Sequence, residues 1–136
     1  MYGLVSVSHI GQKRTTNQDS ICLYPKRSFF AVADGMGGHN GGDIASQMSV
    51  KILPEFIEEN IEKLEVPILL DKAIKHVNRS IYNHGQKNVE LKGMGTTITA
   101  MMLNGNQVNI ANIGDSRTYM VSKNKLYQMT RDHSLV

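Results

Sequence analysis

The stretch FFAVADGMGGHNGGDIAS, residues 29–46, constrains the fold of this chain more than any other. A short apolar run, typical of a buried β-strand, ends at Asp34, and five glycines follow between Gly35 and Gly42. Glycine loses more conformational freedom on folding than any other residue, so a loop this rich in glycine indicates backbone held close to a ligand. The sequence therefore predicts a strand that ends at a carboxylate beside a binding loop.

The length and composition limit the classes of protein to which this chain can belong. Its 136 residues suit one domain with a substantial core. The formal net charge is +3, but lysines and arginines are scattered among acidic residues and tryptophan is absent, so nucleic-acid binding is not expected. Cys22 is the only cysteine, which excludes an internal disulfide, and no long apolar run is present. These features predict a soluble cytoplasmic protein without a membrane partner.

The order of the expected strands and helices favours an α+β fold with a mainly antiparallel sheet. Three strands are expected near the N-terminus, at 3–11, 20–24 and 29–33. After two helices, further strands are expected at 96–103, 107–113, 118–121 and 126–130. Asn104 and Gly105 predict a two-residue hairpin turn of type I′ between the first two of these.

Both helices are predicted from apolar residues at helical spacing. The first begins at Asp43, and Pro54 is expected to kink it or to start a new turn. The second is expected to begin near Asp71 and to end at Gly85 in a left-handed conformation. The apolar stripe consists of Ile44, Met48 and Ile52 in the first helix, and of Ala73, Ile74, Val77 and Ile81 in the second.

The glycine-rich loop matches neither of two common phosphate-binding motifs. A Walker A motif requires Gly-Lys-Ser/Thr, and the dinucleotide-binding pattern requires a third glycine where Asn40 stands. In isolation, Asp34 before Gly35 is equally compatible with an ordinary turn. Mg²⁺ or Mn²⁺ is the better candidate ligand, because such ions prefer carboxylate, carbonyl and water oxygens.

Two further aspartates also lie at the ends of predicted strands. Arg14 and Asp19 stand in a loop between two strands, and Asp115 follows the strand at 107–113. Each is compatible with an ordinary loop or tight turn. Together with Asp34 they predict a converging site for metal and phosphate, in which the planar guanidinium of Arg14 suits the phosphate.

Six segments occur in a fixed order along the chain: GQKRTTNQDS, AVADGMGGHNGG, DIAS, GMGTT, NIGDSRTYM and MTRDHS. Together they resemble the metal-dependent protein phosphatases, the type 2C serine/threonine phosphatases, in their bacterial form. The resemblance implies a four-layer αββα sandwich of two antiparallel sheets flanked by helix pairs. It also implies hydrolysis of phosphoserine and phosphothreonine in proteins, with two Mn²⁺ or Mg²⁺ ions and, in some members, a weaker third.

The resemblance assigns roles to individual residues. Asp34 resembles the carboxylate that bridges the two metal ions, and Gly35 resembles the residue whose carbonyl binds one of them. Asp19 resembles an acidic residue near the same ion, and Arg14 the arginine that binds the substrate phosphate. Asp115 resembles a ligand of the third ion. The implied nucleophile is a water between two ions, so no covalent phosphoenzyme is expected.

The proton donor to the leaving group stays open between His39 and a metal-bound water. His39 lies in the glycine loop, and an imidazole titrates near neutral pH. Met36, however, stands where eukaryotic-type members of the family carry a histidine. Cys22 is expected to be a core residue, and Thr96 and Thr97 are expected to serve in strand formation and packing.

The resemblance covers the N-terminal half of the family's catalytic domain, so residues 1–136 are expected to be part of one such domain, here truncated. The family's later strands and two further aspartates have no counterpart before Val136. Two functions therefore stay open: a protein phosphatase, and a non-catalytic interaction module. The expected partners are phosphorylated proteins, with a serine/threonine kinase or a second copy of the chain as further candidates. The isolated chain is expected to dimerise, swap strands or aggregate, with Val108, Ile110 and Ile113 among the residues at risk because neighbouring strands are absent, and to show weak metal binding and negligible turnover.

Overall fold

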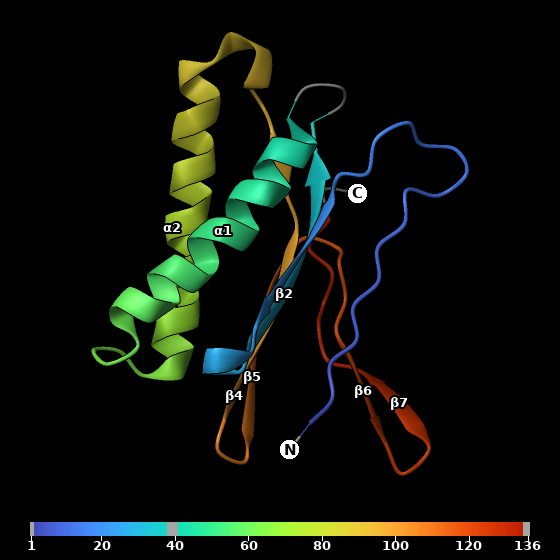
Figure 1. The fold of residues 1–136 in the computed structure, drawn as a ribbon, viewed down its shortest axis with the longest axis vertical. Coiled ribbons are helices and arrows are strands. Elements are labelled where there is room, and N and C mark those ends of the chain that lie inside the picture. Colours follow the sequence, from blue (N-terminus) through green and yellow to red (C-terminus); the bar gives the residue numbers. More distant parts are fainter. Residues whose placement is uncertain (1, 38–40, 135–136) are drawn as a thin grey trace.

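The computed structural model describes residues 2–37 and 41–134. Its elements follow the predicted order, with strands first, then two helices, then strands again (Figure 1). The helices are α1 (Gly42–Asn60) and α2 (Val66–Lys87), with short 3₁₀ turns η1 (Pro25–Arg27) and η2 (Val89–Leu91). The strands are β1 (Asp19–Tyr24), β2 (Phe29–Met36), β3 (Gly95–Thr96), β4 (Ile98–Asn104), β5 (Gln107–Ile113), β6 (Tyr119–Ser122) and β7 (Lys125–Gln128).

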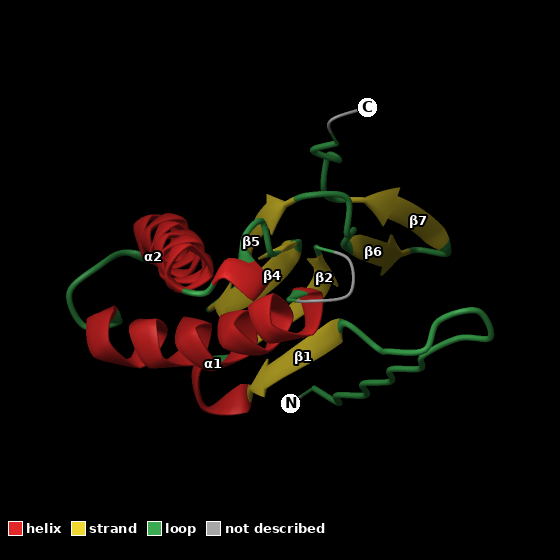
Figure 2. Ribbon diagram, turned by 90° about the horizontal axis from the view of Figure 1, so that it is seen from above, coloured by secondary structure: helices red, strands yellow, loops and turns green. Residues whose placement is uncertain are grey.

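Most of the strands form one antiparallel sheet, in the order β1-β2-β4-β5, and β3 pairs with the end of β2. The strands β6 and β7 form a separate hairpin. Figure 2 shows both helices on one side of the large sheet, with residues 2–18 and the β6–β7 hairpin on the other. Helix α1 packs against β1, β2 and α2. One face of the sheet is therefore covered by helices and the other is only partly covered.

The alternation of side chains along β2 follows from this one-sided cover. Phe29, Ala31 and Ala33 are buried on the helical side, whereas Val32 and Asp34 are exposed on the opposite side. Directly opposite residues in an antiparallel ladder share a face. The register of the sheet therefore decides which side chains join Asp34 on the open face.

The strand predicted at residues 3–11 is wrong. The segment is extended, but none of the described strands forms a backbone ladder with it, and Val5 and Val7 are 96% and 88% exposed. Alternating apolar and polar residues suit a strand, yet a strand exists only where a neighbour supplies hydrogen-bond partners. This segment has the sequence pattern of a strand, but among the described residues it has no neighbouring strand to pair with.

Both predicted helices exist, but their expected boundaries need correction. Pro54 lies inside α1 and starts no new helix. Helix α2 begins well before Asp71, with Pro67 in its first turn, where the missing N–H removes no helical hydrogen bond. Gly85 does not end α2: a Cβ there would lie 3.1 Å from the Leu91 carbonyl oxygen, so glycine permits close packing instead. Among the described residues, no helix is long and apolar enough to cross a membrane.

The hairpin after the helices is present, but its turn differs from the prediction. Asn104 pairs with Gln107, so the two loop residues are Gly105 and Asn106, and of these only Gly105 has a positive φ, of 59°. This pattern of signs is that of a type II′ turn, not type I′. The polar turn predicted around Lys123 does have two positive φ values, as type I′ requires.

Candidate metal and phosphate site

The carboxylate of Asp34 stands near the end of β2, on backbone that is fixed from both sides. Its N–H donates to Thr97 Oγ1 at 3.0 Å, and its carbonyl accepts from the Thr97 N–H at 2.9 Å. The following N–H, of Gly35, donates to the Gln18 carbonyl at 3.0 Å. Asp34 is therefore positioned by the segment before β1 and by the segment between β3 and β4.

Asp19 lies directly opposite Asp34 in the β1–β2 ladder. The two carboxyl groups share the open face of the sheet, where directly opposed like charges are unfavourable. Partial burial raises the pKa of Asp34, the charge of Asp19 and a hydrogen bond with it raise that pKa further, and Asp115 adds to the effect. The positive charge of Arg14 acts in the opposite direction. The excess of negative charge favours a bound cation at this position.

One cavity of about 600 Å³ at this end of the sheet collects predicted site residues from three distant segments. Asp19 does not line this cavity, but its carboxyl group interacts with that of Asp34, which does. His39 lies outside the described residues, so its role as proton donor stays a prediction. The predicted site residues that line the cavity are Arg14, Asp34, Gly35 and Asp115.

The side chains of this site offer few ligands to a metal ion. In residues 2–37 and 41–134, no group of three or more His, Cys, Asp or Glu side chains is arranged to hold an ion. The opposed pair of Asp19 and Asp34 nevertheless suits a hard cation, because carboxylate oxygens are its preferred ligands. Mg²⁺ usually keeps several waters when a protein supplies only one or two carboxylates. The residues therefore fit a divalent ion that stays largely hydrated and is held weakly.

Two glycines beside Asp34 are explained by packing. A Cβ on Gly35 would collide with the carbonyl of Gly42, at the start of α1. A Cβ on Gly42 would lie 2.8 Å from the side chain of Gln18. The absence of side chains thus lets the end of β2, the start of α1 and the segment before β1 approach closely. At these two positions the structure explains glycine without a ligand, which the sequence alone does not reveal.

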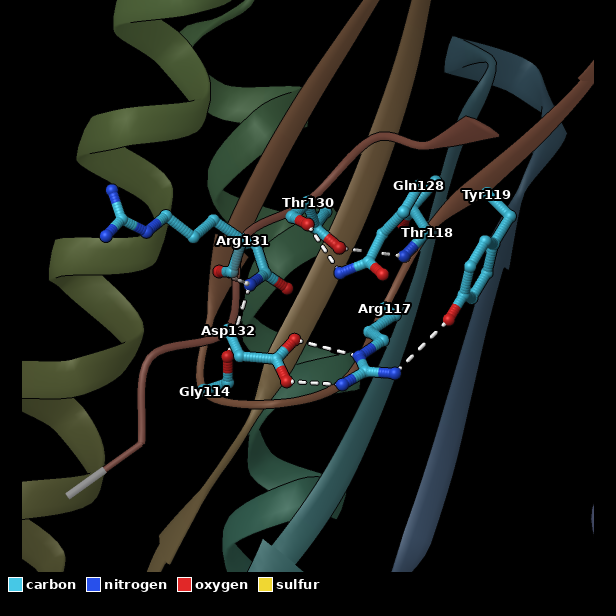
Figure 3. Close-up of polar contacts among 9 residues, drawn as sticks. Gly114, Arg117, Thr118, Tyr119, Gln128, Thr130, Arg131 and Asp132 are labelled. Carbon is cyan, nitrogen blue, oxygen red and sulfur yellow. Dashed lines mark hydrogen bonds and ion pairs between the residues drawn. The ribbon is translucent and has the colours of Figure 1, made fainter. Parts of the chain in front are cut away.

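The turn that carries Asp115 is held by the last described residues of the chain. The His133 N–H donates to the Gly114 carbonyl at 2.8 Å. Arg117 donates two hydrogen bonds to the Asp132 carboxylate, at 2.9 and 2.7 Å (Figure 3). These hydrogen bonds lower the pKa of Asp132. The segments NIGDSRTYM and MTRDHS therefore support each other, and Arg117 is engaged by Asp132.

Thr97 belongs to this site, although its sequence context predicts only strand formation and packing. It lines the cavity, is only 3% exposed and binds the backbone of Asp34 on both sides. Threonine is common in strands, so its pattern predicts strand formation and packing. The only signal in the sequence is its place in the GMGTT segment, which does not reveal the contact with Asp34.

Comparison with known proteins identifies the family. A family model described as Protein phosphatase 2C matches residues 7–134. The chain is 41% identical over 132 residues to the serine/threonine phosphatase stp of Listeria welshimeri, covering 93% of this chain and 52% of that protein. The chain thus spans about half the length of this curated relative.

Solved structures agree with the sequence comparison. The crystal structure of the Mycobacterium tuberculosis serine/threonine phosphatase PstP/Ppp matches with a TM-score of 0.84 and 34% identity, covering 95% of this chain and 54% of that one. The catalytic domain of PstP in complex with two manganese ions matches with a TM-score of 0.83 and 34% identity, covering 95% of this chain and 55% of that one. Fold, order of motifs and family model agree, and this chain belongs to the protein phosphatase 2C family.

Proposed function

We propose that this chain provides the cation-binding and phosphate-binding part of a divalent-metal-dependent phosphatase acting on phosphoserine and phosphothreonine in proteins. The observation that carries the proposal is the opposed pair of Asp19 and Asp34, with Arg14 and Asp115 close by. Carboxylates attract a divalent cation, and a guanidinium attracts phosphate. Metal-assisted hydrolysis of a phosphate monoester needs a carboxylate site for the cation and a positive group for the phosphate close to each other.

Asp34 is the proposed central ligand for Mn²⁺ or Mg²⁺. Asp19, the carbonyl of Gly35 and Asp115 are the further proposed ligands. The raised pKa of Asp34 supports this assignment, as does the related crystal structure of the PstP catalytic domain in complex with two manganese ions. When bound, such ions supply a water that ionises near neutral pH and positive charge for the phosphate oxygens.

Arg14 is the proposed ligand of the substrate phosphate. It is exposed in the segment before β1, lines the cavity, and lowers the pKa of Asp34 through its charge. A planar guanidinium donates two parallel hydrogen bonds to phosphate oxygens, which a lysine cannot do. In this position Arg14 would orient the phosphate and offset the repulsion between the phosphate and the carboxylates.

Phosphorylated proteins are the proposed substrates and partners. The relatives are named serine/threonine phosphatases, and one is named a serine/threonine protein phosphatase. Phosphoserine and phosphothreonine in proteins are made by protein kinases, so a serine/threonine kinase is the class of enzyme that must supply this substrate.

A second candidate function is a non-catalytic interaction module. The small number of metal ligands among the described residues favours it. So does the partly uncovered face of the sheet, where a second cavity of about 450 Å³ has apolar walls. A second copy of the chain is the proposed occupant of this face, and phosphoprotein binding would then occur without hydrolysis.

Two proteins are needed to test the proposed function: the 136-residue chain, and a chimera in which the chain replaces the 132 matched residues of the Listeria welshimeri phosphatase stp. Hydrolysis of a phosphothreonine peptide is measured with Mn²⁺ and with EDTA. We expect the chain alone to bind Mn²⁺ weakly with negligible turnover, because it supplies few ligands. The chimera is expected to release phosphate only when Mn²⁺ is present.

The outcomes separate the two functions. A chimera that folds and binds Mn²⁺ but releases no phosphate would contradict the catalytic proposal. If it still binds the phosphopeptide, the non-catalytic module is the better description. Release of phosphate that is unaffected by EDTA would contradict the metal-dependent chemistry itself.

A further inference from the structure

Thr97 occupies an unusual place between two parts of the proposed site. It follows β3 directly and makes two backbone contacts with Asp34: its N–H donates to the Asp34 carbonyl, and its Oγ1 accepts the Asp34 N–H. Its side chain is almost fully buried. The backbone that carries the Asp34 carboxylate is therefore held by one residue at both its donor and its acceptor.

The same side chain also supports the turn that carries Asp115. Thr97 Oγ1 also lies 2.6 Å from Ser116 Oγ, a hydrogen bond in which either hydroxyl can be the donor. Gly114 has a φ of +92°, and a Cβ there would lie 2.6 Å from the methyl group of Thr97. The turn thus rests directly on Thr97, with glycine required by both its conformation and this contact.

We propose that Thr97 is a positioning residue that fixes Asp34 and the Asp115 turn relative to each other, so that both carboxylates are held in place at the metal site. The inference rests on the proposed function, because it assigns Thr97 to the proposed metal site. A hydrogen-bond partner behind a metal ligand typically changes metal affinity by about 10- to 100-fold when it is removed. Thr97 acts through the backbone of Asp34 and through Ser116, without touching the ion.

Thr99 provides an internal comparison. It lies on β4, is 7% exposed, and forms the same kind of hydroxyl contact, at 2.7 Å from Thr118 Oγ1. It therefore links the large sheet to the segment after Asp115 much as Thr97 does. The described contacts of Thr99 do not include Asp34. A general effect of losing a buried threonine hydroxyl should appear at both positions, whereas a positioning effect should appear at Thr97 alone.

The test combines two measurements on the 136-residue chain. Hydrogen exchange of the Asp34 amide, followed by NMR without metal, reports the hydrogen bond to Thr97 Oγ1. Titration with Mn²⁺ alone reports the affinity of the site. The variants are Thr97→Val, which removes the hydroxyl, Thr97→Ser, which keeps it, and Thr99→Val as the matched control.

For Thr97→Val we expect exchange of the Asp34 amide to accelerate severalfold and Mn²⁺ affinity to fall by about tenfold or more. Thr97→Ser is expected to stay close to wild type in both measurements, and so is Thr99→Val. Unchanged Mn²⁺ affinity in Thr97→Val, or an equal loss in Thr99→Val, would overturn the inference. The proposed function would survive that result, because the wild-type chain would still bind the ion.

Ser116→Ala keeps the inference testable if Thr97→Val does not fold. This variant removes the contact with the turn while leaving Asp34 and Thr97 in place. We expect Mn²⁺ affinity to fall severalfold and exchange of the Asp34 amide to stay unchanged. Wild-type affinity in this variant would overturn the inference. A wild-type chain that binds no Mn²⁺ would instead contradict the proposed function, and the assignment of Thr97 with it.

Discussion

At the scale of single residues, the chemistry of the site depends on charges that the sheet register brings together. Asp19 and Asp34 are far enough apart in the sequence that their contact cannot be read from spacing, yet they are direct partners across β1 and β2. Arg14 and Asp115 complete the charge pattern from two other segments. These site residues could be proposed from the sequence because each lies next to a segment with a strand-like pattern. That they lie close together could be seen only from the pairing register of the strands in the structure.

Arg14 is expected to matter for substrate binding and for turnover together. In the chimera with the Listeria welshimeri phosphatase, Arg14→Ala should raise KM and lower kcat, because a charge-assisted hydrogen bond contributes about 1.5–3 kcal/mol, or roughly ten- to hundredfold in kcat/KM. Arg14→Lys should recover only part of this loss. Steady-state kinetics with a phosphothreonine peptide measure both variants.

The control for Arg14 is Lys13→Ala, the neighbouring exposed cation, which does not line the cavity. It should leave the kinetics nearly unchanged. Equal effects of the two substitutions would mean that only the net charge of the loop matters, and would contradict a specific role for Arg14.

Cys22 is expected to be chemically inert in the folded chain. It is 6% exposed, and burial raises the pKa of its thiol to about 11. Near pH 8 the thiol therefore stays protonated in the folded state, whereas the reactive form is the thiolate. Labelling with an aromatic disulfide reagent should be slow in buffer and fast in denaturant. Rapid labelling of the folded chain would show that Cys22 is accessible and would contradict its assignment to the core.

At the scale of secondary structure, local sequence patterns predict an element correctly where its hydrogen-bond partners lie nearby in the chain. The β4–β5 hairpin and both helices were predictable because short connections and periodic apolar residues specify them. Residues 3–11 were not, because their alternation has no described strand to pair with. The prediction that α2 ends at Gly85 was wrong for a similar reason, because this glycine is explained by its close packing against Leu91.

An ion cluster joins the β1–β2 connection to α1. Glu58 accepts hydrogen bonds from Tyr24 Oη, Lys26 Nζ and Arg27, each near 2.8 Å. The hydrogen bonds from Arg27, then from Lys26 and Tyr24, hold the pKa of Glu58 well below its usual range. A carboxylate with a lowered pKa in the folded state stabilises the fold above its unfolded pKa, and the contribution is lost as the pH falls.

The free energy of unfolding should therefore depend on Glu58 in a pH-dependent way. The difference between wild type and Glu58→Gln is expected to be largest at neutral pH and to shrink from about pH 5 downward. Urea unfolding at several pH values measures it. Glu59→Gln, an exposed neighbour on α1 outside this cluster, is the control. A difference that stays constant down to pH 2 would contradict the assigned role of Glu58.

At the scale of the whole molecule, the described chain has helices on one face of its sheet and an incomplete layer on the other. The α+β class was predictable from the order of elements, but the degree of cover was not, because it depends on long-range packing. Of the β5 residues expected to be at risk in association, Val108 is exposed on the open side and Ile110 is half-buried. Ile113 lies opposite Ile98 and packs against the helical core, so it does not contribute to the open face.

The open face is expected to cause concentration-dependent self-association. Val5 and Val7 line the cavity on this face and are almost fully exposed, and exposed apolar patches favour association. Light scattering of the isolated chain should show species larger than a monomer. The double substitution Val5→Lys and Val7→Lys should reduce them.

The matched control is Val89→Lys, since Val89 is 90% exposed on η2, outside this cavity. It should leave association unchanged. A chain that stays monomeric at all concentrations, or an equal effect of Val89→Lys, would show that the open face is not the associating surface.

The most direct test of the site is a Mn²⁺ titration of the wild-type chain and of Asp34→Asn, followed by the electron paramagnetic resonance signal of the free ion. Asparagine keeps the volume of the side chain but removes the ligand charge, so the fold should persist. We expect saturable binding in the wild type, at least about tenfold weaker binding in Asp34→Asn, and wild-type behaviour in Asp71→Asn, whose carboxylate is paired with Lys75 on α2. Equal Mn²⁺ affinity in wild type and Asp34→Asn would contradict the assignment of Asp34 as the central metal ligand.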